Sequence, residues 1–221
     1  MLRVRPTLIS TDTQLPGILL PALGMVQRTG TALFDAGGGR IALQPGPHEG
    51  TLLGFEAGIL EEFARRTRES GTAAEVISSA AGAISVSVVA DEQAFTVDQG
   101  ERLLHPDADP ALTVVCLWST PTPLRAARML SNIGARPLNT AADATEFTEF
   151  TAKNGGRVAV RPAAQQSFQL GFDYAGDVAG LRLRVLHAGF PAAISETGGT
   201  RILTVPASAH RSFTIRERPE G

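Results

Sequence analysis

The chain has 221 residues, of which 43% are hydrophobic and 19% charged, and its 20 basic and 22 acidic side chains leave a net charge of -2. This is the composition of a folded globular protein, and the balanced charge disfavours nucleic acid as a partner because phosphate binding draws on excess positive charge. The single cysteine, Cys116, excludes an intrachain disulfide, and the sequence shows neither a signal peptide nor an apolar run of the roughly 18 residues that a membrane helix needs, so we expect a cytoplasmic protein.

An internal repeat is the strongest pattern in the sequence. Four segments recur in the same order: 8–11 (LIST) as 117–120 (LWST), 38–45 (GGRIALQP) as 155–162 (GGRVAVRP), 53–56 (LGFE) as 170–173 (LGFD), and 95–97 (FTV) as 213–215 (FTI). The separations are 109, 117, 117 and 118 residues. Such constancy predicts two copies, with boundaries at 1–108 and 109–221.

In chain order, the first copy opens with an apolar run at 4–10 that predicts a strand. Two prolines and a glycine between 16 and 21 make the next segment a poor helix, and only the repeat supports a helix there. A hairpin follows, because the runs 31–35 and 40–44 flank three consecutive glycines. A phosphate-binding loop is the other interpretation of these glycines, but no helix and no Lys-Ser/Thr pair follows them.

The rest of the first copy is expected to hold one strand, one helix and two more strands. The helix is indicated by an apolar stripe at 59–63 and by Glu/Arg pairs four residues apart. The strands are expected at 52–57, 84–89 and 94–97.

The second copy repeats this order with clearer signals. After a strand at 112–118, Thr122 can cap a helix whose first position is Pro123. A hairpin then turns through an Asn-Gly pair at 154–155, which suits a tight turn, and a strand is expected at 168–174.

Residues 178–186 fit two interpretations. Every second residue from 181 to 185 is apolar, as in a strand, but the apolar positions also fit a helix. The corresponding helix of the first copy favours the helix. Strands at 202–205 and 212–216 are expected to end the copy.

A duplicated unit of one strand, one helix and three strands, with a Gly-Phe-acidic strand end, resembles the vicinal oxygen chelate superfamily of glyoxalases, bleomycin-resistance proteins and extradiol dioxygenases. The segments that carry the resemblance are 9–12 (ISTD), 23–25 (LGM) and 53–56 (LGFE), the last being similar to the family's His-Leu-Ala-Phe-Glu segment. The resemblance covers the whole chain. It implies an α+β fold in which two tandem βαβββ modules curl a mixed sheet into a cup that encloses a small molecule.

Metal-dependent members of this family bind a divalent ion through a His on the first strand, a His on the fourth and a Glu on the last, which leaves coordination sites open for substrate oxygens. The corresponding positions are Arg5 and Val114 on the first strands, Leu52 and Gln169 on the fourth, and Thr96 and Thr214 on the last. None of these residues is a His or a Glu. The resemblance therefore implies a member that lacks the metal ligands, and we expect no metal and no other cofactor.

The histidines and the cysteine offer no alternative site. His48, His105, His187 and His210 are scattered along the chain, and we interpret each as a solvated side chain. Cys116 lies within a predicted strand with no histidine nearby in sequence, so a buried thiol is favoured over a nucleophile.

Candidate ligand-binding residues follow from strand alternation, since residues two apart share a face. If Val114 faces the cup, so does Trp118, the only tryptophan and the candidate for stacking on a ligand, although a tryptophan in a strand is also often part of a core. The polar candidates are Gln169, Asp173, Thr214 and Arg216 in the second copy, and Arg5 and Glu56 in the first.

Three functions are consistent with these features. The favoured one is a metal-independent binding protein for a small organic molecule, because the ligand positions carry no metal ligands. The second is an enzyme of the lyase or dioxygenase type, with a metal held elsewhere or with acid–base chemistry through Glu56 or Asp173. The third is a scaffold whose cup is filled. The expected partner is a small molecule, with no nucleic acid and no membrane, and the chain is expected to be a monomer or a homodimer.

Overall fold

The computed structural model describes residues 1–79, 82–90, 93–101, 103–138, 147–208 and 211–218. The elements of the first half are β1 Arg3–Val4, β2 Thr7–Ser10, α1 Gln14–Ala22, β3 Val26–Gln27, β4 Leu33–Asp35, β5 Arg40–Pro45, β6 Gly50–Leu52, β7 Gly54–Ala57, α2 Leu60–Glu69, β8 Ala73–Ser78, β9 Ile84–Ala90 and β10 Gln93–Gln99. Those of the second half are β11 Leu112–Thr120, α3 Pro123–Asn132, β12 Arg136–Pro137, β13 Thr148–Thr151, β14 Arg157–Pro162, β15 Ser167–Tyr174, α4 Val178–His187, β16 Ala193–Thr197, β17 Thr200–Pro206 and β18 Ser212–Glu217.

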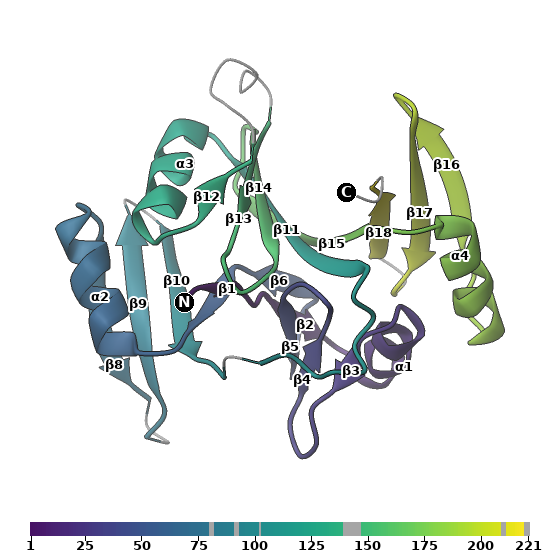
Figure 1. The fold of residues 1–221 in the computed structure, drawn as a ribbon, viewed down its shortest axis with the longest axis horizontal. Coiled ribbons are helices and arrows are strands. Elements are labelled where there is room, and N and C mark those ends of the chain that lie inside the picture. Colours follow the sequence, from purple (N-terminus) through teal and green to yellow (C-terminus); the bar gives the residue numbers. More distant parts are fainter. Residues whose placement is uncertain (80–81, 91–92, 102, 139–146, 209–210, 219–221) are drawn as a thin grey trace.

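In each half of the chain, a strand, a helix and a group of strands follow one another, and this order occurs twice (Figure 1). In the second half, β15 ends the first run and also opens the second. In the first half, β2, α1 and β3–β6 form one run, and β7, α2 and β8–β10 form the other. In the second half, β11, α3 and β12–β15 form one run, and α4 with β16–β18 then returns to pair with the end of β15. The expected α+β fold class with a curled mixed sheet is confirmed.

The second half contains one continuous sheet of eight strands in the order β12-β13-β14-β11-β15-β18-β17-β16. Its long central strands β11 and β15 are antiparallel, whereas β15 and β18 are parallel. Figure 1 shows β14 and β17 standing on opposite sides of β15, so the sheet curls around this strand.

In the first half the same arrangement is divided into two sheets, β3-β4-β5-β2-β6 and β1-β7-β10-β9-β8. The predicted single first strand is split at Pro6, which has no backbone N–H to donate. The register continues across the break, since Arg3 lies opposite Glu56 and Thr7 lies opposite Leu52. The two sheets are therefore one interrupted surface.

Strand pairing corrects the alignment of the first strands. Thr7 pairs with Ala42 and Leu117 pairs with Ala159, and these alanines belong to segments 117 residues apart. The separation of the first strands is thus 110 residues and not 109, which makes Val115, rather than Val114, the counterpart of Arg5. A shift of one residue reverses the face of every side chain on a strand.

The four predicted helices are present. α4 confirms the helix interpretation of 178–186, and it starts at a side-chain cap: the Asp177 carboxylate accepts hydrogen bonds from the backbone N–H groups of Ala179 and Gly180 at 3.0 and 3.2 Å. None of the helices described has both the length and the apolar character needed to cross a membrane.

The sequence patterns do not predict β8 and β16. Both strands lie at sheet edges, and most of their residues are exposed. An edge strand with little buried surface lacks the apolar alternation from which strands are recognised.

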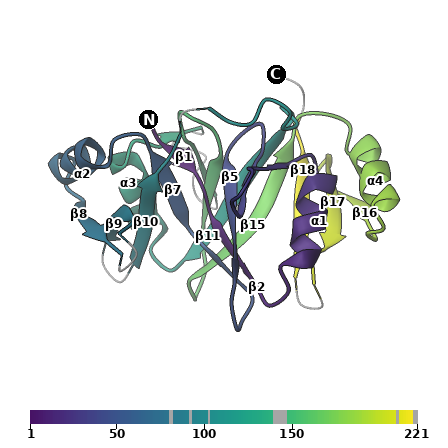
Figure 2. The ribbon, with the colours of Figure 1, turned by 90° about the horizontal axis from the view of Figure 1, so that it is seen from below.

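Two hydrophobic cores form, and each combines residues from both halves. One packs Phe55 and Val86 against Trp118 and Leu130, and the other packs residues such as Leu8 and Leu20 against residues such as Phe172 and Phe213. Figure 2 shows the consequence for the helices: α2 and α3 lie together at one end of the molecule, and α1 and α4 at the other. The halves do not pack as separate bodies.

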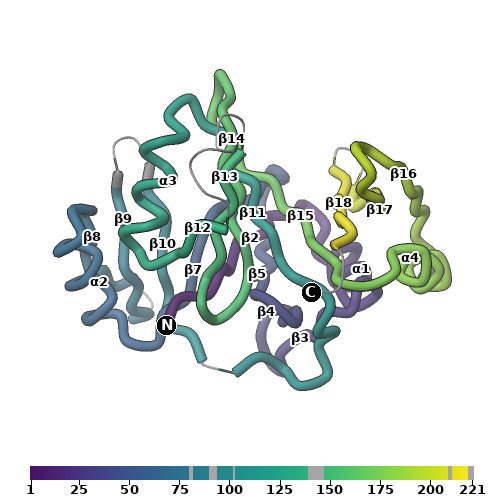
Figure 3. Tube along the Cα trace, turned by 45° about the horizontal axis from the view of Figure 1, so that its top comes forward, coloured from purple at the N-terminus to yellow at the C-terminus, as the bar shows by residue number. Residues whose placement is uncertain are grey.

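The repeated Gly-Gly pairs mark the contact between the halves. A Cβ on Gly155 would lie 2.8 Å from the backbone nitrogen of Gly39, and one on Gly156 would lie 2.5 Å from the Cβ of Val4. The backbone N–H of Val4 donates to the Gly155 carbonyl at 3.0 Å, and Figure 3 shows the N-terminal strand in purple passing beside β7. These glycines thus permit close backbone packing in hairpin turns.

Candidate functional site

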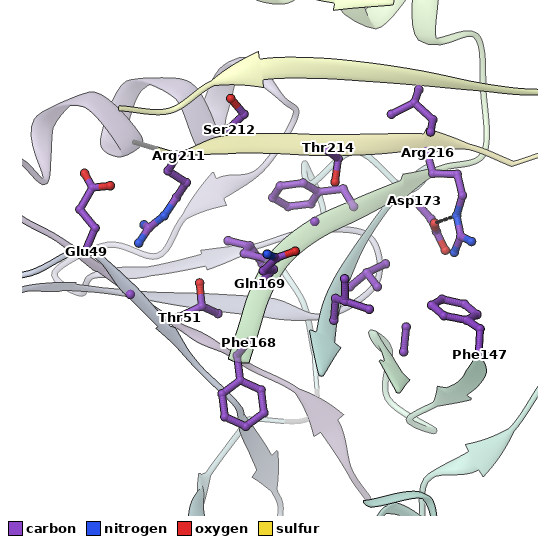
Figure 4. Close-up of a pocket in the computed structure, with 18 residues that line it drawn as sticks. Glu49, Thr51, Phe147, Phe168, Gln169, Asp173, Arg211, Ser212, Thr214 and Arg216 are labelled. Carbon is purple, nitrogen blue, oxygen red and sulfur yellow. Dashed lines mark hydrogen bonds and ion pairs between the residues drawn. The ribbon is translucent and has the colours of Figure 1, made fainter. Parts of the chain in front are cut away.

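A cavity of about 610 Å³ lies on the concave face of the curled sheet. Its floor and walls come from β11, β15 and β18, and β6 of the first half contributes one side (Figure 4). The lining residues are Glu49, Gly50, Thr51, Val115, Leu117, Phe147, Ala159, Phe168, Gln169, Leu170, Gly171, Phe172, Asp173, Ile202, Arg211, Ser212, Thr214 and Arg216. Apolar walls with a few polar groups are typical of small-molecule sites.

Strand alternation brings four of the predicted polar residues to this cavity. Gln169 and Asp173 line it from β15, and Thr214 and Arg216 line it from β18. In Figure 4, Gln169 and Thr214 lie near the centre of the cavity, whereas Asp173 and Arg216 lie together at one end.

The positions at which the resemblance places metal ligands adjoin one another on this surface. Val115, Gln169 and Thr214 occupy β11, β15 and β18, which are neighbours in the sheet, and all three line the cavity. They offer an isopropyl group, an amide and a hydroxyl. Across the part of the chain that the structure describes, no group of three or more His, Cys, Asp or Glu side chains is placed to hold a metal ion.

Trp118 does not lie on the cavity, which corrects the placement expected from the sequence. Its side chain is 1% exposed and belongs to a hydrophobic core, where its ring centroid lies 5.6 Å from that of Phe168. The cause is the one-residue shift of the first strand: Val115 and Leu117 face the cavity, so Val114, Cys116 and Trp118 face the cores.

Asp173 is held by three guanidinium groups. It accepts hydrogen bonds from Arg157 at 2.7 Å, Arg216 at 2.9 Å and Arg218 at 3.2 Å. Arg216 and Arg218 also bond to Glu149, the latter at 2.6 Å. A carboxylate engaged on both oxygens is poorly placed to accept a proton from a ligand.

The electrostatics of this cluster favour its charged state. Burial tends to raise the pKa of Glu149, but hydrogen bonds from Arg216 and Arg218 outweigh it and lower that pKa. Burial likewise tends to lower the pKa of Arg216, but the hydrogen bonds and negative charges of Asp173 and Glu149 raise it.

Arg5 and Glu56 do not line this cavity but lie in a buried ion network of the first half. Glu56 accepts from Arg3 at 3.0 Å and from Arg40 at 2.9 Å, and the Arg5 guanidinium lies 3.7 Å from it. Arg5 also pairs with Asp98. Both predicted residues are thus brought together, although in a network separate from the cavity that holds the other polar candidates.

The same Arg–carboxylate pair recurs at equivalent positions of the two halves. Arg40 bonds to Glu56 in the first half, and Arg157 bonds to Asp173 in the second. Both pairs join segments that recur 117 residues apart, so part of the sequence repeat preserves an ion pair. The surroundings differ, because the side chain of Arg40 is 2% exposed and that of Arg157 is 29% exposed.

The remaining predictions concern histidine and cysteine. His48 and His187 are exposed, and His105 lies 3.7 Å from Asp107; His210 lies outside the described residues. Cys116 is a buried free thiol whose pKa is raised to about 12 by burial.

Sequence reasoning missed Arg211, Glu49 and the two phenylalanines, Phe147 and Phe168, that line the cavity. Arg211 and Glu49 precede β18 and β6, in segments that show no periodicity. Arg211 lies one residue before the last strand, and alternation from Ser212, Thr214 and Arg216 assigns it to the opposite face, so the strand pattern gives no signal for it.

Searches by sequence found no match: no family model matches the chain, and no curated protein is significantly similar to it. Solved structures do match. The 2,3-dioxygenase LapB from Pseudomonas sp. KL28 superposes with a TM-score of 0.63 at 12% identity, covering 98% of this chain and 91% of that one. A variant of homoprotocatechuate 2,3-dioxygenase from B. fuscum gives a TM-score of 0.66 at 11% identity, covering 97% of this chain and 70% of that one.

A glyoxalase from Novosphingobium aromaticivorans, solved with Mn(II) bound, is similar as well. Its TM-score is 0.60 at 11% identity, and the match covers 97% of this chain and 80% of that one. At these identities the comparison establishes the fold. The chain shares the fold of these dioxygenases and of this glyoxalase, as the resemblance implied.

Proposed function

We propose that this chain is a cytoplasmic binding protein that holds a small organic molecule in the cavity beside β15 and β18, without a metal ion. The observation that carries the proposal is the set of groups at the centre of the cavity. Val115, Gln169 and Thr214 stand where the resemblance places two His and one Glu. An isopropyl group cannot coordinate a metal, whereas an amide and a hydroxyl within apolar walls are suited to orient an organic ligand.

The state of the two candidate acid–base residues supports binding over catalysis. Glu56 accepts from Arg3 and Arg40 in a buried network, and Asp173 accepts from three arginines. Either carboxylate would have to give up charge-assisted hydrogen bonds before it could take a proton, which opposes use as a general base.

The proposal can be tested by a substitution that places a bulky side chain in the cavity. Thr214→Phe introduces a ring from an exposed position on β18, and Thr96→Phe makes the same change at the matching exposed position of β10. A thermal-shift screen with aromatic antibiotics and 2-oxo compounds should identify ligands that raise the melting temperature of the unchanged protein. A ligand at about 100 times its Kd adds about 2.7 kcal/mol to the free energy of unfolding.

We expect the shift to disappear in Thr214→Phe and to persist in Thr96→Phe. A library that shifts nothing, or shifts that survive Thr214→Phe, would contradict the proposal. Elemental analysis of protein purified without chelators tests the metal-free part separately: stoichiometric Fe, Zn, Ni or Mn would overturn that part and leave the cavity assignment standing.

We also infer that the halves, 1–108 and 109–221, are copies of one ancestral unit. The support is the repeated ion pair of Arg40 with Glu56 and Arg157 with Asp173, together with the matching strand registers. On this view the copies diverged at the strand-one position: Arg5 fills it with an ion pair in the first half, and Val115 leaves it apolar in the second.

A further inference from the structure

Arg211 lies at the end of the cavity opposite Asp173 and Arg216 (Figure 4). Its Nη1 donates to the backbone carbonyl of Ile9 at 3.2 Å, which fixes the side chain against the first half. No carboxylate of the described residues lies within salt-bridge distance of this guanidinium. The nearby Glu49 instead accepts from the Ser208 hydroxyl at 2.6 Å.

The Arg211 guanidinium is partly desolvated, and its positive charge is only partly compensated by nearby negative charge. Burial lowers the pKa of Arg211, and the negative charge of Glu49 opposes this effect only in part. A guanidinium has five N–H donors, and the Ile9 carbonyl uses one of them. A half-buried arginine in this state gains most from an oxyanion that can accept two parallel hydrogen bonds.

The opposite end of the cavity does not supply that anion. Among the described residues there, the guanidinium groups of Arg157, Arg216 and Arg218 meet two carboxylates, those of Asp173 and Glu149. This cluster carries an excess positive charge, so the field it adds to the cavity also favours an anion over a cation. The carboxylate of Glu49, which lies at the Arg211 end of the lining, opposes the positive field of this cluster.

The rest of the lining is mainly apolar and includes Val115, Leu117 and Phe168. It also holds the side-chain amide of Gln169 and the hydroxyl groups of Thr51, Ser212 and Thr214. A ligand that satisfies both features has one carboxylate and an aromatic or aliphatic body.

We propose that the cavity takes an organic monocarboxylate, with Arg211 as the residue that binds its carboxylate. This inference rests on the proposed function and adds the class of ligand. The neutral amide of the same acid fits the same walls but cannot form the charge-assisted pair, so it serves as the matched probe.

The experiment measures the affinities of three acid–amide pairs by calorimetry: phenylacetate with phenylacetamide, 4-phenylbutyrate with 4-phenylbutyramide, and 2-naphthoate with 2-naphthamide. We expect at least one acid to bind roughly tenfold or more tighter than its amide, as one charge-assisted hydrogen bond predicts. Arg211→Gln should remove this preference and leave the affinity for the amide unchanged. Arg211→Lys, which keeps the charge but loses the planar fork, should restore part of it.

Arg128→Gln is the matched control. It removes one positive charge from an exposed position of α3 that does not line the cavity, so the preference should remain. Equal affinities for acids and amides, or a preference that survives Arg211→Gln, would overturn the inference and leave cavity binding intact. Failure of every acid and every amide to bind would overturn the inference and count against the proposed function as well.

Discussion

Replacing Arg40 with Met tests whether the buried ion network of the first half stabilises the fold. Arg40 donates to both oxygens of Glu56 at 2.9 Å and also bonds to Asp35, and its side chain is 2% exposed. Methionine keeps much of the side-chain volume but leaves the buried carboxylates of Glu56 and Asp35 with one positive partner fewer. Breaking a buried pair typically costs about 3 to 5 kcal/mol of unfolding free energy.

The lower end of that range applies here. After the change Glu56 keeps Arg3 at 3.0 Å, and Asp35 keeps Arg28 at 3.0 Å. We therefore expect a loss of about 3 kcal/mol, which corresponds to a urea midpoint lower by roughly 1 M if the denaturant slope is about 3 kcal/mol/M.

Arg157→Met is the internal control, because it removes the equivalent arginine of the second half. That side chain is 29% exposed, and Asp173 keeps Arg216 and Arg218. Solvent screening limits the expected loss to about 1 kcal/mol or less. Equal losses in the two variants would refute the reasoning that burial of the network sets its contribution. If Arg40→Met does not fold, Arg40→Lys keeps the charge and allows the same comparison with Arg157→Lys.

Two further predictions concern titration. The folded-state pKa of Glu149 lies below its ordinary value, so its carboxylate stabilises the fold at neutral pH, and this contribution is lost as the pH falls through the lowered pKa. The difference in urea midpoint between the unchanged protein and Glu149→Gln should thus be largest at about pH 7 and should shrink steadily as the solution is acidified toward the lowered pKa; a difference that does not vary with pH would contradict this. The Cys116 thiol, with its pKa raised to about 12, should react with a thiol reagent at about pH 8 only when urea unfolds the chain, and rapid labelling of the native protein would show that the thiol is accessible.

Much of the fold follows from local patterns and from the repeat. The repeat supported a helix at the proline-rich segment that forms α1, and it decided between strand and helix at α4. Propensity alone would have missed α1, because Pro21 lies inside the helix. The exposed edge strands β8 and β16 were missed because they bury too little surface to impose a pattern.

The site depended on register, and there the sequence was ambiguous by one residue. Aligning LIST with LWST matches the most letters, but the backbone pairs Leu8 with Leu43 and Trp118 with Val160, at equivalent places. The one-residue error in the sequence alignment assigned the core-facing side chains of β11 to the cavity, and it therefore placed Trp118 there. On β15 and β18 the alignment had the right register, and Gln169, Asp173, Thr214 and Arg216 line the cavity.

The way each core is assembled has a consequence for how the chain reaches its native state. Val4 packs in the same core as Phe150 and Val160, and Leu8 in the same core as Phe213, so neither core can close until the C-terminal half has been made. When only the first half of the chain has left the ribosome, that half exposes the apolar side chains of both incomplete cores. Such a surface is prone to aggregation. Contacts spanning most of the sequence also carry a large loop-closure entropy, and folding should be slow for a chain of this length. The two halves therefore interlock, and the cavity, which is lined by residues of both, forms only after both are complete.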